Sequence, residues 1–339
     1  MGLSRMVDHI KPLLRPKSDR QFSHSLCQKR MLRTLLYINR RWVISFTTSM
    51  LRNNLLVHSY LSKMTKMNIH HYTNASTLPL ILDSKKIRFT RADLLDDGSE
   101  MPFRTAYLNP QQYFISSWTH ADRELSGQWY RYGDHDRGVR LTLPDSPFTY
   151  YHLKDDISAS DESGSFGIML NGIDAPFSLE TMLGKGFVLI PYLEMDKYFG
   201  GFVNYVSDPA LQASNLYSTD EDGTHISLPG HLGRIKSKFW SDQEEYRFVL
   251  VAYQGPDLKR SEVTEVYDRE LLSRYQAGQT VIPAQIQHID LPLAEDMLSQ
   301  LIVTLGPRIS SENREMVYQA MCKFSPSGIV RESEMNIRS

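Results

Sequence analysis

Short runs of apolar residues, alternating or continuous, recur along most of the chain and favour strands over helices. Gly138-Val-Arg-Leu-Thr-Leu143 alternates with its apolar residues on one face, as a half-buried strand does. Phe248-Val-Leu-Val251 is apolar throughout, which is typical of a fully buried strand. The strands predicted in this way are residues 69–73, 86–90, 113–118, 138–143, 186–192, 201–206, 248–251 and 300–305.

Few segments have the spacing of a helix. The predicted helices are residues 75–83, 124–132 and 311–324, the last with Ser310 or Ser311 as its N-cap. Segments 155–175 and 207–231 are rich in Ser, Asp and Gly and are expected to be loops. Many short strands with few helices indicate an α+β fold. A Rossmann or P-loop fold has no support, because no Gly-rich phosphate loop follows a strand.

Composition narrows the class of protein. With 339 residues and 41% hydrophobic residues, the chain can bury a large core, which excludes wholesale disorder. No apolar run approaches the roughly 20 residues that cross a bilayer, so no membrane partner is expected. Cys27 and Cys322 fit no metal or redox spacing, and the histidines are scattered. We therefore expect a cytoplasmic protein without a metal ion.

Charge divides the chain into two parts of opposite sign. Residues 1–67 hold 13 Lys and Arg residues against two acidic residues, whereas residues 68–339 hold 25 against 37. We expect a basic N-terminal extension over residues 1–67, with one or two amphipathic helices between Leu26 and Tyr60. Residues 68–339 are expected to form one domain, whose acidity argues against long, nonspecific contacts with nucleic acid.

Three interpretations of the extension remain open. It is a membrane-surface or nucleic-acid-binding arm, an organelle-targeting peptide, or a non-native stretch upstream of the true start. Met64 and Met67 are alternative starts directly before the first convincing strand, which favours the last interpretation.

The most informative segment is Lys238 to Val251, where polar residues lead directly into a buried strand. These polar residues are Gln243, Glu244, Glu245 and Arg247. Two carboxylates and a guanidinium at the mouth of a buried strand are costly to desolvate, so the position requires a compensating interaction or a function. One interpretation is a salt-bridged strand entrance. The other is the edge of an active site, at which a carboxylate is held rigidly.

Several short motifs follow one another in an order that resembles a bacterial family, catalogued as the domain of unknown function number twenty-nine seventy-one. The resemblance covers roughly residues 69 to 335. The family's usual Asn-Asp-Pro appears here as Asp96-Asp97-Gly98. The matching motifs are His70-His-Tyr-Thr73, Ile81-Leu-Asp-Ser-Lys-Lys-Ile-Arg88, Ser116, Trp129 with Tyr132-Gly133, Gly138-Val139, Glu245-Tyr-Arg247 and Ile302-Val-Thr-Leu-Gly-Pro-Arg308.

The family's layout is similar to the ADP-ribosyltransferase fold, a split, bent mixed β-sheet with flanking helices around an NAD cleft. The resemblance implies transfer of ADP-ribose from NAD to a macromolecule, which is RNA, DNA or protein. It also implies the role of a bacterial toxin or anti-phage effector, and a toxin would add a neutralising antitoxin as a partner. The alternative is a catalytically inert binding module of the same fold, in which Glu245 and Arg247 are structural.

The resemblance implies a catalytic role for Glu245, which would bind the ribose 2′-hydroxyl on the nicotinamide side. A preorganised carboxylate there stabilises the positive charge that develops at the anomeric carbon. Gln243, two residues earlier, would lie on the same strand face and position the acceptor. Arg247 would either pair with Glu245 or bind a pyrophosphate oxygen.

The remaining implied residues belong to the NAD cleft. His71 would bind the adenosine ribose, and Ser116 or Ser117 would shape the floor of the cleft. Tyr130 or Tyr132 would stack on nicotinamide. Two further aromatic residues, Tyr72 and Trp129, are expected in the same cleft.

Overall fold

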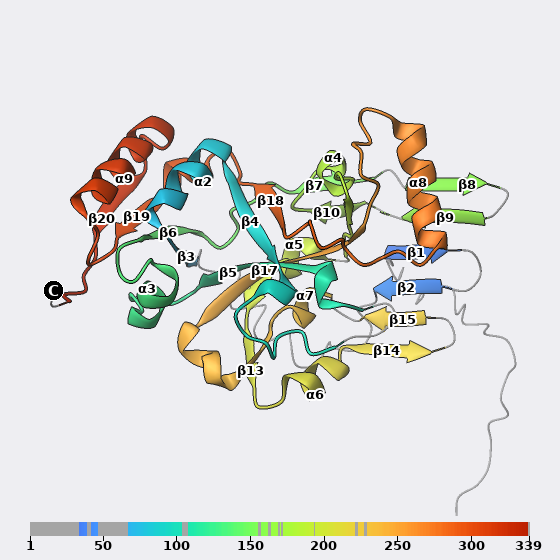
Figure 1. The fold of residues 1–339 in the computed structure, drawn as a ribbon, viewed down its shortest axis with the longest axis horizontal. Coiled ribbons are helices and arrows are strands. Elements are labelled where there is room, and N and C mark those ends of the chain that lie inside the picture. Colours follow the sequence, from blue (N-terminus) through green and yellow to red (C-terminus); the bar gives the residue numbers. More distant parts are fainter. Residues whose placement is uncertain are drawn as a thin grey trace, which may run out of the picture. The chain divides into compact units, whose positions relative to one another are not determined.

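The computed structural model describes residues 34–38, 42–46, 67–103, 108–154, 157–161, 164–168, 170, 172–192, 194–220, 223–226 and 229–337. The fold is α+β, with a bent mixed sheet and flanking helices (Figure 1). The main sheet has ten strands. Its central path runs through β11 (Phe187–Leu189), β17 (Glu245–Gln254), β5 (Tyr113–Thr119), β3 (Asn68–Thr73), β6 (Val139–Pro144), β19 (Ile302–Leu305) and β20 (Ile329–Glu332). Off this path lie β12 (Gly200–Phe202), β4 (Lys86–Arg91) and β18 (His288–Pro292).

Strand β17 is the longest strand of this sheet, because its apolar run can be buried on both faces. It pairs antiparallel with β5 from Glu245 opposite Thr119 to Val251 opposite Tyr113. Nine of its ten residues are buried, which confirms the strand predicted around residues 248–251. The pairing also carries the polar start of β17 into the middle of the sheet, beside the end of β5.

The sheet divides on the other side of β5. Strand β3 pairs with β5 only through His70 opposite Thr119, whereas β4 pairs with it through residues 114 and 115. Residues 116–118 therefore have no strand partner on this side. The two strands β3 and β4 diverge here, and the resulting gap is called the fork below.

A second sheet has six strands in the order β14–β15–β2–β1–β9–β8. Helix α8 (Thr264–Gln276) packs against β8 and β9 (Figure 1). The bounds of the strands are β1 (Thr34–Ile38), β2 (Trp42–Phe46), β8 (Ile157–Asp161), β9 (Gly164–Ile168), β14 (Tyr217–Asp220) and β15 (Gly223–Ile226).

This second sheet corrects three predictions. The helices expected between Leu26 and Tyr60 are wrong for residues 34–38 and 42–46, which are strands β1 and β2. Both segments are rich in β-branched and aromatic residues, which favour strands. The loops expected at 155–175 and 207–231 are wrong as well, because they contain β8, β9, β14 and β15. Strands β9 and β15 pair with the distant strands β1 and β2, and β8 and β14 add to them as hairpins; local composition does not reveal the distant pairing.

The domain boundary at residue 67 stays a prediction. Strands β1 and β2 lie before it, yet β1 pairs with β9 and β2 pairs with β15. The remainder of the expected extension lies outside the described residues. Among the described residues, none of the helices combines the length and the apolar character that spanning a bilayer requires.

The three predicted helices are confirmed as α2 (Leu78–Ser84), α3 (Ser126–Tyr132) and α9 (Ser311–Phe324). The hydroxyl of Ser310 caps α9 by accepting a hydrogen bond of 3.1 Å from the backbone of Asn313. The predicted strand 201–206 is two strands, β12 and β13 (Asn204–Val206), and β13 pairs parallel with β16 (Ile235–Ser237). The remaining short elements are β7 (Tyr151–Leu153), β10 (Ile173–Ala175), α4 (Leu179–Met182), α5 (Met195–Tyr198), α6 (Pro209–Ser214), α7 (Pro229–Leu232), η2 (Ala75–Thr77), η3 (Ala92–Leu94), η4 (Pro110–Gln112), η5 (Lys238–Gln243) and η6 (Met297–Gln300).

Candidate functional site

A cavity of about 260 Å³ lies at the fork. Its walls come from β3, β4 and β5, from the start of β17, from α3 and from the loop that follows β4. Six residues implied by the family resemblance line it from different parts of the chain: His71, Tyr72, Ser117, Tyr132, Glu245 and Arg247. The fork therefore brings together side chains that are up to 176 positions apart in the sequence.

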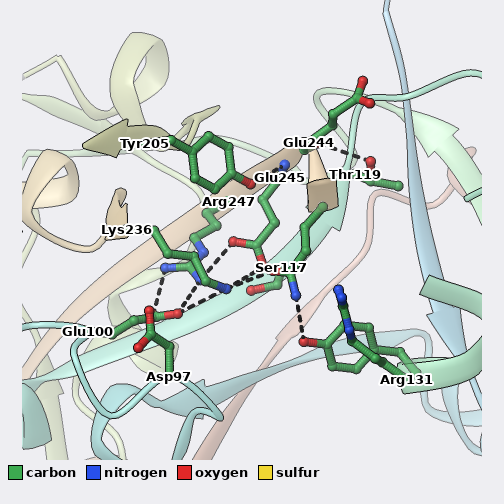
Figure 2. Close-up of polar contacts among 12 residues, drawn as sticks. Asp97, Glu100, Ser117, Thr119, Arg131, Tyr205, Lys236, Glu244, Glu245 and Arg247 are labelled. Carbon is green, nitrogen blue, oxygen red and sulfur yellow. Dashed lines mark hydrogen bonds and ion pairs between the residues drawn. The ribbon is translucent and has the colours of Figure 1, made fainter. Parts of the chain in front are cut away.

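Four charged side chains form a buried cluster on one wall of the cavity (Figure 2). Arg247 donates to both carboxylate oxygens of Glu100 at 2.8 Å each, through Nη1 and Nη2. Its Nη2 atom also lies 2.8 Å from Oε2 of Glu245. Lys236 Nζ lies 3.1 Å from Oε1 of Glu100 and 3.3 Å from Oε1 of Glu245. We call these four residues the charge quartet.

The charge quartet is formally neutral, with two carboxylates and two cations. Burying so many charges is tolerated only when each is paired and hydrogen-bonded. Burial alone would lower the pKa of Arg247, but Glu245 and Glu100 outweigh it and hold that pKa above its ordinary value. The predicted salt-bridged strand entrance is thus present. Of the two roles expected for Arg247, the structure contains the pairing with Glu245.

Glu245 is not fully satisfied by this pairing. Its Oε1 atom accepts a hydrogen bond from Lys236 at 3.3 Å. Its Oε2 atom is buried and accepts no hydrogen bond from the described residues, because the nearby Arg247 Nη2 is not aligned as a donor. A buried carboxylate oxygen without a donor is costly. It is suited to a ligand that brings a hydroxyl or amide N–H into the cavity.

The backbone around Glu245 is held firmly. The preceding residue, Glu244, has a left-handed backbone with φ 45°, which is uncommon for a residue other than glycine. Its carbonyl accepts hydrogen bonds from the backbone of His120 at 3.0 Å and from the hydroxyl of Thr119 at 2.9 Å. The backbone N–H of Glu245 donates to the hydroxyl of Tyr205 at 2.9 Å (Figure 2). Strained backbone held by such contacts is frequent at functional sites.

Gln243 contacts the same cluster, but from a helix instead of from the strand position that was predicted. It is the last residue of η5 rather than part of β17, so the prediction that it shares a strand face with Glu245 is wrong. The left-handed Glu244 breaks the alternation between them. The amide oxygen of Gln243 accepts from Lys236 Nζ at 2.8 Å, and its amide nitrogen donates to the Tyr132 hydroxyl at 3.2 Å. Gln243 therefore connects the charge quartet to α3.

His71 offers a hydrogen-bond acceptor to the cavity. Its Nδ1 atom lies 3.0 Å from the carbonyl oxygen of Ser117, which can only accept, so Nδ1 carries the proton. Burial lowers the pKa of His71, which favours the neutral ring. In a neutral imidazole protonated at Nδ1, Nε2 is an acceptor. The ring can thus accept a hydrogen bond from a ligand hydroxyl.

The structure distinguishes the two candidate serines. Ser117 lines the cavity. Ser116 is buried, and its hydroxyl accepts a hydrogen bond of 3.1 Å from the indole N–H of Trp118. Of this pair, Ser117 is therefore the one in a position to contact a ligand.

The candidate aromatic residues divide in the same way. Tyr132 lines the cavity, and burial, followed by the charges of Asp96 and Glu245, raises its pKa to about 12. Tyr130 is 60% exposed, contacts His135 and is not among the cavity-lining residues. Tyr72 also lines the cavity, and Trp129 packs edge-on against it with ring centroids 4.8 Å apart. Trp129 itself is fully buried behind Tyr72, outside the cavity.

Three residues of the site were not predicted from the sequence. Glu100 lies in the loop after β4, Lys236 on the short strand β16, and Tyr205 on β13. Lys236 follows an apolar residue in a segment without a clear period, so its burial has no local signal. Glu100 follows the acidic Asp96-Asp97-Gly98, but nothing in this segment indicates that its carboxylate is buried against Arg247.

Among the described residues, no three His, Cys, Asp or Glu side chains are grouped as a metal site requires. That the site needs no metal stays a prediction. Comparison with protein-family models, curated proteins and solved structures gave no match for this chain.

Proposed function

We propose that this protein transfers ADP-ribose from NAD to a macromolecular acceptor, and that Glu245 stabilises the reacting sugar. The observation that carries the proposal is the convergence of His71, Ser117, Tyr132 and Glu245 on one cavity at the fork. The family resemblance implied these residues for a single NAD cleft, and the cavity brings them together. This agreement supports the proposal.

The proposed reaction breaks the bond between the anomeric carbon and the nicotinamide nitrogen. The bonding electron pair leaves with nicotinamide, which departs as a neutral molecule and needs no protein acid. The positive charge that develops on the sugar would be stabilised by the carboxylate of Glu245, whose Oε2 would accept a hydrogen bond from the ribose 2′-hydroxyl. A nucleophile of the acceptor then bonds to the anomeric carbon and loses its proton.

The size of the cavity limits which part of NAD it can hold. Its volume of about 260 Å³ is slightly below the roughly 300–1,000 Å³ of typical ligand pockets. The nicotinamide riboside half is therefore the part that we assign to the cavity. Tyr132 is the stacking residue and Ser117 lies on the floor. His71 would then accept a hydrogen bond from a hydroxyl of this ribose, and not of the adenosine ribose that the family resemblance implied.

A second candidate function is a binding module without catalysis. The observation in its favour is the pairing of Glu245 with both Arg247 and Lys236 inside the charge quartet. A carboxylate held by two cations can be purely structural, because removing it would leave uncompensated buried charge. Oε2 of Glu245 favours the enzyme, because it is ion-paired with Arg247 but accepts no hydrogen bond from the described residues, and a purely structural carboxylate gains nothing from that arrangement.

The biological role is proposed on the family resemblance alone. We infer a bacterial toxin or anti-phage effector that acts in the cytoplasm on RNA, DNA or protein, with an antitoxin as a further partner. The acidic domain, with 25 basic against 37 acidic residues, favours a compact acceptor site over a long nucleic-acid track.

The decisive experiment incubates the protein with NAD labelled in the adenine moiety and with a cell extract. Free nicotinamide is measured, and the extract is then fractionated into protein, RNA and DNA. We expect nicotinamide release together with label in one fraction. A thermal shift with NAD but no release would instead support the binding module. Neither shift nor release at millimolar NAD, in protein freed of bound nucleotide, would contradict both functions.

A further inference from the structure

Glu100 is the carboxylate of the charge quartet to which the proposed reaction assigns no role. It comes from the loop after β4, and its side chain is 2% exposed. Both of its oxygens accept hydrogen bonds from Arg247, and Lys236 lies 3.1 Å from Oε1. Its contacts are therefore more complete than those of Glu245.

The loop presents Glu100 through a turn of its own. The backbone N–H of Glu100 donates to the carbonyl of Asp97 at 3.0 Å. The carboxylate of Asp97 accepts from the backbone and the hydroxyl of Ser99, at 2.9 and 2.6 Å. Met101, the next residue, has φ 51°, which turns the chain away. Glu100 thus enters the cluster from one fixed position.

Glu100 and Glu245 compete for the same cations. The two Nη1 protons of Arg247 go to Glu100 and to the carbonyl of Gly233, at 2.8 and 3.1 Å. One Nη2 proton goes to Glu100 as well, so the two parallel N–H donors of the guanidinium are aligned with Glu100 rather than with Glu245. Bidentate alignment is the strongest geometry for such a pair. Without Glu100, the guanidinium would turn its paired donors to Glu245, and the existing 2.8 Å ion pair with Oε2 would become an aligned hydrogen bond.

We propose that Glu100 is a positioning residue, which engages Arg247 and Lys236 so that Oε2 of Glu245 stays free for a hydroxyl of the substrate. This role rests on the proposed function. Burial by itself raises the pKa of Glu100, but the charges and hydrogen bonds of Arg247 and Lys236 outweigh it and hold that pKa below its ordinary value. Glu100 is then ionised at neutral pH, as the competition for Arg247 requires.

The test measures nicotinamide release and NAD affinity for Glu100→Gln, with Glu244→Gln as the matched control, because the Glu244 carboxylate pairs with Arg123 outside the charge quartet. In Glu100→Gln we expect kcat to fall on the order of 10- to 100-fold, because small misplacements of a reacting group have effects of this size. The Kd for NAD should stay within about threefold, since ground-state contacts are kept. Glu244→Gln should keep most of the wild-type kcat.

A second variant covers the case in which Glu100→Gln does not fold. Glu100→Asp keeps the charge but is one methylene shorter, and it should recover part of the lost kcat with an unchanged Kd. Activity of Glu100→Gln and Glu100→Asp equal to the wild type would overturn the positioning role while leaving the proposed function in place. An equal loss in Glu244→Gln would overturn it too, because the loss would then not be specific to Glu100. A wild type that releases no nicotinamide overturns both.

Sharing of Arg247 can also be measured without NAD, by urea unfolding of Glu100→Gln, Glu245→Gln and the double variant. If the two carboxylates share the cations, the double variant loses more stability than the two single losses together. Additive losses would overturn the competition on which the positioning role depends.

Discussion

The side-chain amide of Gln243 donates a hydrogen bond of 3.2 Å to the hydroxyl of Tyr132, although 111 positions separate them in the sequence. Through this contact, helix α3 and the segment before β17 fix the same wall of the cavity. Tyr132 lines the cavity to which we assign nicotinamide, while its hydroxyl accepts the hydrogen bond from Gln243. Tyr132 therefore makes two contributions, a hydrogen bond through its hydroxyl and a cavity wall through its ring, and substitutions can remove the hydroxyl alone or both together.

Removal of the Tyr132 hydroxyl and removal of its ring should have different effects. Tyr132→Phe loses one buried hydrogen bond, which we expect to reduce stability by about 1 kcal/mol with little change in NAD affinity. Tyr132→Ala also loses the stacking surface and should weaken NAD binding clearly. Tyr130→Ala is the matched control, because that ring is 60% exposed and is not among the cavity-lining residues. Calorimetric titration with NAD checks this, and an effect of Tyr130→Ala like that of Tyr132→Ala would contradict the assignment.

Glu245→Gln should reduce nicotinamide release by on the order of 10²–10³-fold, the range seen when one preorganised electrostatic group is lost. The isosteric amide keeps the shape but leaves Arg247 and Lys236 with Glu100 alone, so stability should also fall, by up to ~3–5 kcal/mol. Glu244→Gln is the matched control, since its carboxylate pairs with Arg123 at the surface. The kinetics should be measured at a temperature where both variants are folded. Turnover by Glu245→Gln at the wild-type rate would show that Glu245 is structural.

His71→Ala should weaken NAD binding, whereas Glu245→Gln should largely preserve it. The imidazole contributes a ground-state hydrogen bond to the ribose, while the charge of Glu245 matters mostly in the transition state. Wild-type protein at a 100-fold excess of NAD over its dissociation constant should gain about 2.7 kcal/mol of stability. The thermal shift with NAD should be smaller in His71→Ala. Equal shifts in both variants would argue against a contact between His71 and the nucleotide.

His70 should make the protein less stable in mild acid. Burial, and then the charge of Arg140, lower its pKa from 6.5 to about 4, against opposing effects of Asp122. The unfolded chain then binds a proton more readily than the folded chain, so the contribution of His70 is complete above pH 6.5 and is lost as the pH falls towards 4. The loss is on the order of 3 kcal/mol. Urea unfolding from pH 7.5 to 4 checks this, and His70→Gln should flatten the curve. An identical pH dependence in the variant would refute the assignment.

Two truncated chains test whether strands β1 and β2 contribute to stability: one begins at Leu32 and keeps both strands, and the other begins at Met67 and lacks them. The charge pattern alone predicts that removal of residues 1–66 has little effect. Strands β1 and β2 predict otherwise, because they occupy the middle of the six-stranded sheet and connect β15 to β9. A chain that begins at Met67 should therefore melt earlier than one that begins at Leu32, by about 2 °C for each kcal/mol lost in a chain of this length. Equal melting temperatures of the two chains would instead support the predicted domain boundary at residue 67.

The elements predicted correctly are those whose signal is local. The apolar run of β17 and the helical spacing of α9 lie within a few neighbouring residues, so the pattern alone reveals them. Strands β8, β9, β14 and β15 lack such a signal. Their sequences are mostly polar, and β9 and β15 contain Gly. Strands β9 and β15 pair with β1 and β2, far away in the chain, whereas β8 and β14 pair with β9 and β15 as hairpins. Composition cannot report a partner at that distance.

The candidate site was predictable in part for the same reason. Tyr130 and Tyr132 are two positions apart, which turns them about 200° from each other on a helix, so only one can face the cavity. The sequence does not say which one, because that depends on how α3 is rotated against the sheet. Glu100 could not be predicted as a site residue from the sequence, since its role depends on the conformation of a loop and on a buried arginine 147 positions away.

The fork leaves the main chain of residues 116–118 without a strand partner on one side, and the carbonyl of Ser117 serves as the acceptor for His71 instead. A main-chain carbonyl is the same in every amino acid, so substitutions at these positions do not remove it. The inner wall of the cavity thus depends on the path of the chain more than on the identity of its residues. During evolutionary divergence, the innermost part of the cavity can persist while the side chains around its mouth, and with them the choice of acceptor, change.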